Sequence, residues 1–346
     1  MPDDQNDGGA TDGGATDGGT GNTDGGNNDG GNADGGGGET PPTVRTCGTM
    51  ESYQLLVAAD PQYADRLAAL ETTTTDYIAL HAQDGDGSVM AARSGPIRIP
   101  VVVHVVYNDA ASNISDAQVQ SQIPVLNADY HKRNTDLKNC PKVWEGVVGD
   151  VNIEFYLATT DPTGAATNGI TRTSTTVASF TDDNKVKSAA TGGHDPWPTD
   201  TYLNIWVCKL ASLLGYAQFP AGPAATDGVV ILHTAFGTTG TAAAPFNLGR
   251  TATHEVGHWL NLRHIWGDVT DCSGTDFVSD TPNAGGPNYG KPTFPHVTCT
   301  NGPNGDMFVN FMDYVDDDTM VMFSKEQALR MQATLSGARS KLGGGP

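Results

Sequence analysis

Three histidines and a glutamate lie close together in residues 254–264, which read HEVGHWLNLRH. On a helix, residues four apart lie one turn above each other on the same face, so His254 and His258 can bind one metal ion. Glu255 points about 100° away around the same helix and can reach a water at the metal without binding the metal itself. The spacing therefore predicts a helical metal site with a carboxylate beside it.

His264 completes this site only if the chain turns after His258. His264 lies six residues further on, out of reach of a helix that runs straight. Asn261 fits such a turn because, after glycine, asparagine best tolerates the left-handed backbone that ends a helix. Three neutral imidazoles leave one tetrahedral position open, as in catalytic zinc sites. A bare HExxH match often arises by accident, but the third histidine and the turn make an accident much less plausible.

The motif resembles the zinc signature of the metzincin peptidases, HExxHxxGxxH, which is followed downstream by a turn containing methionine. Here the downstream stretch is NFMDY, residues 310–314. The stretches LGYAQFP (214–220) and HIWGD (264–268) are similar to the ulilysin-like branch of the pappalysin-like family, M43. The resemblance covers roughly Ile97 to Leu335. Asn261 replaces the glycine of the metzincin pattern, and we expect that change to be tolerated.

The resemblance implies a zinc endopeptidase in which the three histidines bind the metal. Glu255 would act as general base on the metal-bound water and then as general acid to the leaving amine. Met312 would form the apolar floor beneath the imidazoles, and Tyr314 would lie close to the metal and hydrogen-bond the oxyanion. Without the zinc motif, Met312 and Tyr314 would be interpreted as core residues.

An acidic run, Asp316 to Asp318, comes after the methionine-containing turn. The resemblance implies that this chain lines the pocket for the residue after the scissile bond, with Asp317 at its floor. A carboxylate in a partly dry pocket attracts a cation, so we predict cleavage before Arg or Lys. The alternative is a solvated acidic loop. We expect the substrate to lie along an exposed sheet edge, for which Leu213–Phe219 is the candidate.

Five cysteines are an odd number, so at least one stays outside an intramolecular disulfide. The resemblance pairs Cys272 with Cys299, and such a bond implies an oxidising compartment. Cys140 and Cys208 can pair with each other or remain buried thiols. Cys47, in the stretch RTCG, resembles a cysteine switch, in which a thiolate takes the open zinc position and excludes water. The alternatives are a structural or a lipid-bearing cysteine.

Several carboxylates crowd the loop that contains Cys272. They belong to Asp268, Asp271, Asp276 and Asp280. Hard oxygen ligands from a loop suit calcium, and the resemblance favours Asp276 and Thr281 as contributors to a structural calcium site. A solvated acidic loop is again the alternative.

The elements that must position these residues lie beyond residue 96. Predicted strands are Ile99–Tyr107, Val151–Leu157, Tyr202–Cys208, Leu213–Phe219 and Gly228–His233, and predicted helices are Ser115–Arg133, Leu248–Leu262 and Ser324–Leu335. This order favours a mixed sheet with helices packed on it. Together with the resemblance, it predicts an α+β, metzincin-like catalytic domain of two subdomains. The first has a mixed five-stranded sheet, a backing helix and an active-site helix. The second is irregular, with the Met-turn and a C-terminal helix.

Composition divides the chain into three regions. Residues 1–42 are rich in glycine and aspartate and are predicted to be a disordered acidic linker. Residues 43–95 are predicted to be a pro-segment that docks on the catalytic domain, with one helical candidate from Met50 to Leu70 that continues towards Leu80. Its last residues, AARSG, would allow self-processing before Arg93. Residues 96–346 are predicted to be the catalytic domain.

The net charge of −21, from 40 acidic and 19 basic side chains, argues against nucleic-acid binding, because phosphate contacts need clusters of Lys and Arg. No run approaches the roughly 18 apolar residues of a membrane helix. The sequence opens MPDD, without a signal peptide. Because the disulfide implies export, we expect a secreted or envelope-anchored protein whose signal is not in this sequence.

The whole pattern predicts a secreted, monomeric zymogen that acts on protein or peptide substrates. One rival is a non-catalytic binding or adhesion module with a structural metal. The intact Glu255 argues against it, as does the open position, because a structural zinc is usually closed by a fourth protein ligand. A zinc hydrolase of non-peptide substrates is a second rival, but no alternative pocket motif supports it.

Overall fold

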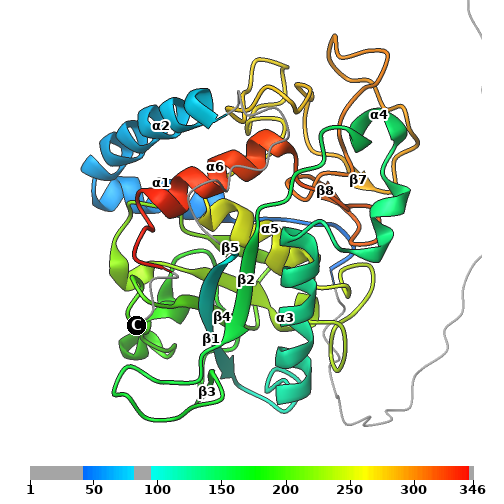
Figure 1. The fold of residues 1–346 in the computed structure, drawn as a ribbon. Helices are drawn as coiled ribbons and strands as arrows, with labels where there is room; N and C mark the ends of the chain where they lie inside the picture. The colour runs from blue at the N-terminus through cyan, green and yellow to red at the C-terminus, as the bar shows by residue number, and fades with distance from the viewer. Residues whose placement is uncertain (1–41, 82–94, 343–346) are drawn as a thin grey trace, which may run out of the picture. The chain divides into compact units, whose positions relative to one another are not determined.

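The structure of the chain is a computed structural model that describes residues 42–81 and 95–342 (Figure 1). The predicted linker falls almost entirely outside these residues, as does the predicted processing site at Arg93. The described part belongs to one unit that begins at Pro41, so its two predicted regions can be described together. They are the predicted pro-segment, 43–95, and the predicted catalytic domain, 96–346, and are called the pro-segment and the catalytic part below.

The central sheet is organised around β1 (Ile97–Tyr107), whose β-branched residues from Val101 to Val103 are fully buried. Its first half pairs with β2 (Ile153–Leu157) and its second half with β3 (Ile170–Ser174). Such a run of valine and isoleucine is typical of a parallel strand that is covered on both faces.

The strand order is β2-β1-β4-β6-β5, with β3 as an additional partner of β1. The remaining strands are β4 (Leu203–Cys208), β5 (Gly215–Ala217) and β6 (Val229–Leu232). All pairs in this sheet are parallel except β5 with β6, so β5 is an antiparallel edge strand. The predicted five-stranded mixed sheet is confirmed. The sheet also has a sixth member, β3, which the sequence does not predict because ITRTS has no apolar pattern of its own.

The helices of the catalytic part position the residues of the site. The backing helix α3 (Asp116–Tyr130) begins at Ser115, whose side chain accepts a hydrogen bond from the Gln118 N–H. The predicted active-site helix is α5 (Arg250–Trp259), and every one of its residues is buried. The C-terminal helix α6 (Lys325–Ser336) begins with a capping box. A short helix, α4 (Lys142–Glu145), comes after α3.

The chain between α5 and α6 has little regular structure, as predicted for the second subdomain. Its short strands β7 (Tyr289–Gly290) and β8 (Tyr314–Val315) pair in parallel. The disulfide between Cys272 and Cys299 closes the loop in this subdomain. The α+β fold predicted from the sequence is therefore the fold observed.

The pro-segment forms two helices where the sequence favoured one. They are α1 (Thr49–Ala59) and α2 (Gln62–His81). Pro61 causes the break, since proline has no backbone N–H and disfavours a helical conformation at the residue before it, here Asp60. The break lets α1 lie against β5 while α2 packs on α6, as Figure 1 shows in blue beside red.

In the described residues, no helix combines the length and the apolar character that crossing a membrane requires.

Candidate active site

Three imidazoles meet at the C-terminal end of α5. The Nε2 atoms of His254, His258 and His264 lie 3.0–3.3 Å from one another. All three side chains are buried. Tetrahedral ligands at zinc–nitrogen distances of about 2.0–2.1 Å lie roughly 3.3–3.4 Å apart, so the spacing fits one zinc ion.

The partners of the three Nδ1 atoms determine which ring nitrogen of each histidine carries the proton. Each Nδ1 faces an oxygen: His254 faces the Phe311 carbonyl at 2.7 Å, and His258 faces the Leu262 carbonyl at 2.8 Å. His264 faces the carboxylate of Asp268. Nδ1 must therefore donate, which leaves three Nε2 lone pairs converging on one point. Burial holds the pKa of His254 and His258 well below the usual value, so these rings stay neutral, as metal ligands must be.

The turn that returns His264 to the site is made at Asn261. Its φ is 75°, in the left-handed region, as expected from the sequence. The Leu260 and Leu262 N–H groups both donate to the Gly257 carbonyl, which closes the end of the helix. This local geometry lets residues six apart in sequence share one site.

Met312 lies directly beneath the helix turn that carries the histidines. It is fully buried, and a Cβ atom at Gly257 would stand 2.5 Å from its sulfur. The missing side chain at Gly257 therefore creates the space that Met312 fills. The ring of Tyr314 lies 4.9 Å from that of His264 and 5.8 Å from that of His254.

Glu255 points from α5 towards the edge strand. Its Oε2 lies 3.1 Å from the Thr49 hydroxyl and 3.5 Å from the Cys47 sulfur. Burial raises the pKa of the Glu255 carboxyl to about 8. A Cβ atom at Gly215 would approach the Glu255 side chain to within 2.9 Å, so β5 packs closely against this carboxylate.

Cys47 reaches the same point from the pro-segment. Its sulfur and the three histidine nitrogens all lie within 4.8 Å of one another. Its backbone pairs in parallel with β5: the Gly48 N–H donates to the Gly215 carbonyl, and the Leu214 N–H donates to the Thr46 carbonyl. Burial and the nearby carboxylate of Glu255 raise the pKa of the thiol. The edge predicted to bind substrate is thus covered by the pro-segment.

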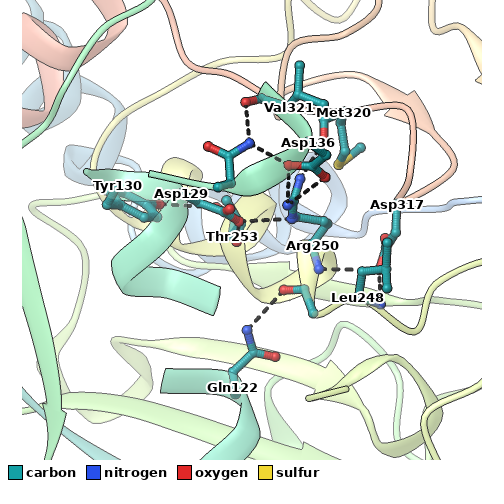
Figure 2. Close-up of polar contacts among 12 residues, drawn as sticks. Gln122, Asp129, Tyr130, Asp136, Leu248, Arg250, Thr253, Asp317, Met320 and Val321 are labelled. Atoms are coloured by element: carbon teal, nitrogen blue, oxygen red, sulfur yellow. Dashed lines mark hydrogen bonds and ion pairs between the residues drawn. The ribbon is translucent and has the colours of Figure 1, made fainter. Parts of the chain in front are cut away.

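Asp317 holds a second pro-segment side chain. Its Oδ1 lies 2.6 Å from Nη2 of Arg45, and both side chains are buried. Its Oδ2 accepts hydrogen bonds from the backbone N–H groups of Leu248, at 2.8 Å, and Arg250, at 3.3 Å (Figure 2). These groups belong to the start of α5, where the helix dipole favours an anion.

Arg250 holds the loop that carries Asp317, a role that no sequence motif indicates. Its guanidinium contacts the carboxylates of Asp129 and Asp136 at 3.1 and 2.9 Å and donates to the Met320 carbonyl (Figure 2). One side chain therefore ties α3 and α5 to the loop that carries Asp317. The members of this cluster are far apart in sequence, so their spacing carries no signal of it.

The acidic residues near Cys272 separate in space. Asp276 and Thr281 are buried and hydrogen-bonded to each other, and burial raises the pKa of Asp276 to about 7. Asp268 contacts His264 instead, and Asp280 accepts hydrogen bonds from Ser324 and Glu326 at the start of α6. The four aspartates thus do not converge on one ion.

The sequence left open whether Cys140 and Cys208 pair with each other. Cys140 and Cys208 are unpaired buried thiols. Burial raises the pKa of Cys140 to about 11, so neither geometry nor acidity favours reactivity there.

Comparison with known proteins finds metallopeptidases, as the three converging imidazoles suggest. A family model described as pregnancy-associated plasma protein-A, of peptidase family M43, matches residues 187–336. An extracellular metalloprotease of Pyricularia oryzae is 31% identical over 272 residues, which cover 75% of this chain and 82% of that protein.

Two solved structures from Tannerella forsythia are more similar in sequence. Mature mirolysin in complex with a cleaved peptide is 53% identical, with a TM-score of 0.70 over 72% of this chain and 96% of that one. A mutant of promirolysin is 48% identical, with a TM-score of 0.76 over 86% of this chain and 97% of that one. The precursor thus matches more of this chain than the mature form does. This chain belongs to the pappalysin family of metzincin metalloendopeptidases, M43.

Proposed function

We propose that this protein is a secreted zinc endopeptidase, made as a latent zymogen, that cleaves peptide bonds before arginine or lysine. One observation carries the proposal: the Nε2 atoms of three imidazoles converge on one point, with a buried glutamate beside them. A closed structural site would need a fourth permanent ligand. Here the fourth group, Cys47, comes from a segment that we propose is removable.

The proposed zinc ligands are His254, His258 and His264. Bound zinc would supply a Lewis acid for the scissile carbonyl and lower the pKa of a water. Glu255 would then take a proton from the attacking water and pass it to the leaving amine. Tyr314 would donate its O–H to the oxyanion, and Met312 would hold the imidazoles from below.

The preference for arginine or lysine would come from Asp317. The ion pair with Arg45 supports this, since the pocket already holds a guanidinium with good geometry. The Phe246 ring, 4.9 Å from the Arg45 guanidinium carbon, adds a favourable surface for a cation. In the mature enzyme, the side chain after the scissile bond would replace Arg45.

Latency would come from Cys47 at the metal. Burial of Cys47 and its pairing with β5 support this, because the same position would otherwise be open to water and substrate. In this proposal residues 43–95 are the pro-segment and residues 96–346 the catalytic domain, preceded by the linker 1–42. We further propose calcium at Asp276 and Thr281, and a secreted or envelope-anchored location.

A peptidase assay tests the proposal. The mature enzyme should cleave a peptide containing one arginine on the N-terminal side of that residue. A chelator should abolish cleavage and added zinc should restore it. Glu255→Gln should still bind zinc but lose activity by several orders of magnitude. Cleavage that survives the chelator or Glu255→Gln would reject the proposal.

A further inference from the structure

A second ion pair joins the pro-segment to the catalytic part, with its arginine buried and its glutamate partly exposed. Both carboxylate oxygens of Glu71, on α2, contact the guanidinium of Arg330, on α6, at 2.5 and 2.8 Å. This bidentate geometry is the strongest that a carboxylate and an arginine form. The catalytic part therefore has a place built for a carboxylate.

Arg330 is also held by a contact within the catalytic part. Its side chain is fully buried, and it also donates to the Asn261 carbonyl at 3.1 Å, in the turn between the second and third histidines. Among the residues described, Glu71 is the carboxylate within ion-pair distance of it, and its Nε has no hydrogen-bond partner. Departure of Glu71 would free the two terminal nitrogens of Arg330 that now bind its carboxylate, so the same fork of N–H donors could bind another carboxylate.

Two other polar side chains of the pro-segment also contact the catalytic part. Arg45 pairs with the carboxylate of Asp317, and the Cys47 sulfur stands at the histidines. Glu71 is a third such side chain, and it is an anion that pairs with the cation of Arg330. The segment that covers the cleft thus presents a cation at one end and an anion at the other.

Arg45 comes before Cys47 in the chain and Glu71 comes after it. In the proposed function, the pocket of Asp317 takes the residue after the scissile bond. From Cys47 the pro-segment runs the other way along the edge strand, where Tyr63 donates to the Phe219 carbonyl at 2.7 Å. The guanidinium of Arg263 lies over the ring of Phe219, at 3.9 Å. With the substrate in the proposed orientation, Arg263 would lie on the side of the residues before the scissile bond.

An open groove is lined by both Arg263 and Glu71. It has a volume of about 510 Å³ and is lined on one side by α2, including Glu71, and on the other by Arg263 and Phe277. The ring of Phe277 also lies 5.5 Å from the guanidinium carbon of Arg330. Removal of α2 would open this groove along its length and expose two cations with an aromatic wall.

We infer that Arg330, with Arg263 beside it, forms an anion subsite of the mature enzyme that takes a substrate carboxylate from a residue before the scissile bond. The inference rests on the proposed function, because it uses the pocket of Asp317 to orient the cleft. The preferred substrate then carries an acidic side chain upstream of the cleaved bond and a basic one directly after it. Glu71 holds the subsite in the zymogen.

The test uses mature enzyme and matched peptides. Every peptide has a single arginine, and glutamate or glutamine is placed in turn at each of the eight positions before it. The measured quantity is the ratio of kcat/KM for the glutamate and glutamine peptides. We expect a ratio of about five to ten at one position or two adjacent ones, and a smaller ratio at high salt. A ratio near one at every position would overturn the inference.

Variants identify the residue responsible. Arg330→Gln should bring the ratio to about one, and a preference that persists would overturn the assignment. Should Arg330→Gln fail to fold, Arg330→Lys keeps the charge without the fork of N–H donors, and the ratio should fall at least threefold. An unchanged ratio would contradict the inference. Failure to cleave the glutamine peptides before arginine would instead count against the proposed function, so the two failures are distinguishable.

Discussion

Arg45 and Asp317 form a buried ion pair, with Nη2 of the guanidinium 2.6 Å from Oδ1 of the carboxylate. The two residues are 272 positions apart. Arg45 also donates to the Thr251 hydroxyl at 3.1 Å, within the active-site helix. The pro-segment therefore holds on to the cleft through an arginine as well as through Cys47, two residues further on.

Latency should depend on both residues. Cys47→Ala should give a full-length precursor with measurable activity, because loss of the thiolate at the metal weakens the binding of the segment and lets water and substrate reach the histidines part of the time. Arg45→Ala together with Cys47→Ala should be more active than either single variant, since loss of a buried ion-pair partner costs about 3–5 kcal/mol. Activity is measured on a small peptide before any processing, with gels to show that the precursor is intact.

Leu55→Ala is a suitable control, because this side chain is half exposed on α1. It should leave the precursor latent. A Cys47→Ala precursor as inactive as the unaltered one would contradict the cysteine switch.

Asn261 should be replaceable by glycine but not by valine. Its φ of 75° costs a β-branched residue about 1–2 kcal/mol and glycine almost nothing. Within the described ranges, its buried amide also has no hydrogen-bond partner, so glycine removes an unsatisfied group. Urea unfolding should show Asn261→Gly at least as stable as the unaltered protein and Asn261→Val clearly less stable. The account of this turn is wrong if the order is reversed.

Gly257→Ala should weaken zinc binding through Met312. A methyl group 2.5 Å from the methionine sulfur forces the floor of the site to move. Overpacking of this kind costs about 1–3 kcal/mol, which exceeds the gain of about 1 kcal/mol from alanine in a helix. Zinc affinity, measured by competition with a chelator, should fall about tenfold.

A double variant provides the control for that effect. Gly257→Ala with Met312→Ala removes the collision, although it leaves a cavity, and should recover part of the zinc affinity. No change in affinity for Gly257→Ala alone would show that Met312 is not fixed against this turn.

The free energy of unfolding should fall as the pH rises from 4 to 7 because of Asp313. Burial raises the pKa of this carboxyl to about 7, and its hydrogen bonds from Asn288 and Tyr314 only partly offset burial. The folded state thus binds a proton that the unfolded state has released above pH 4. Its contribution is fully present below the unfolded pKa and is lost as pH rises through 7.

Asp313→Asn removes this titration. The difference in unfolding free energy between the two proteins should change by up to about 1.4 kcal/mol per pH unit over that range. Urea unfolding in zinc-saturated buffer at four pH values measures it. A difference that does not vary with pH would contradict the assignment.

Local patterns predict most of the fold and the metal centre. The β-branched run of β1 and the histidine spacing of α5 are patterns among residues close together in the sequence, so the sequence predicts both elements. Asn261 signals its turn for the same reason. The strand β3 has no such pattern, and it forms only because the second half of β1 offers it an unpaired edge.

Contacts between distant residues are the part that local patterns cannot reveal. Arg45 stands out in the sequence only as a neighbour of Cys47, and its pairing with Asp317 depends on how the pro-segment crosses the cleft. Arg250 likewise joins α3 to the loop of Asp317, and Glu71 finds Arg330 only when α2 lies on α6. The sequence groups Asp268 with a calcium loop, whereas in the structure it contacts His264.

The most direct test of the account is a cleavage-site profile of the mature enzyme and of Asp317→Asn on a complex mixture of peptides. The account predicts that the unaltered enzyme cuts almost entirely before arginine and lysine. Asp317→Asn, which keeps the shape of the side chain but not its charge, should lose that preference by about a hundredfold relative to neutral residues. An unchanged preference in Asp317→Asn, or no basic preference in the unaltered enzyme, would contradict the account.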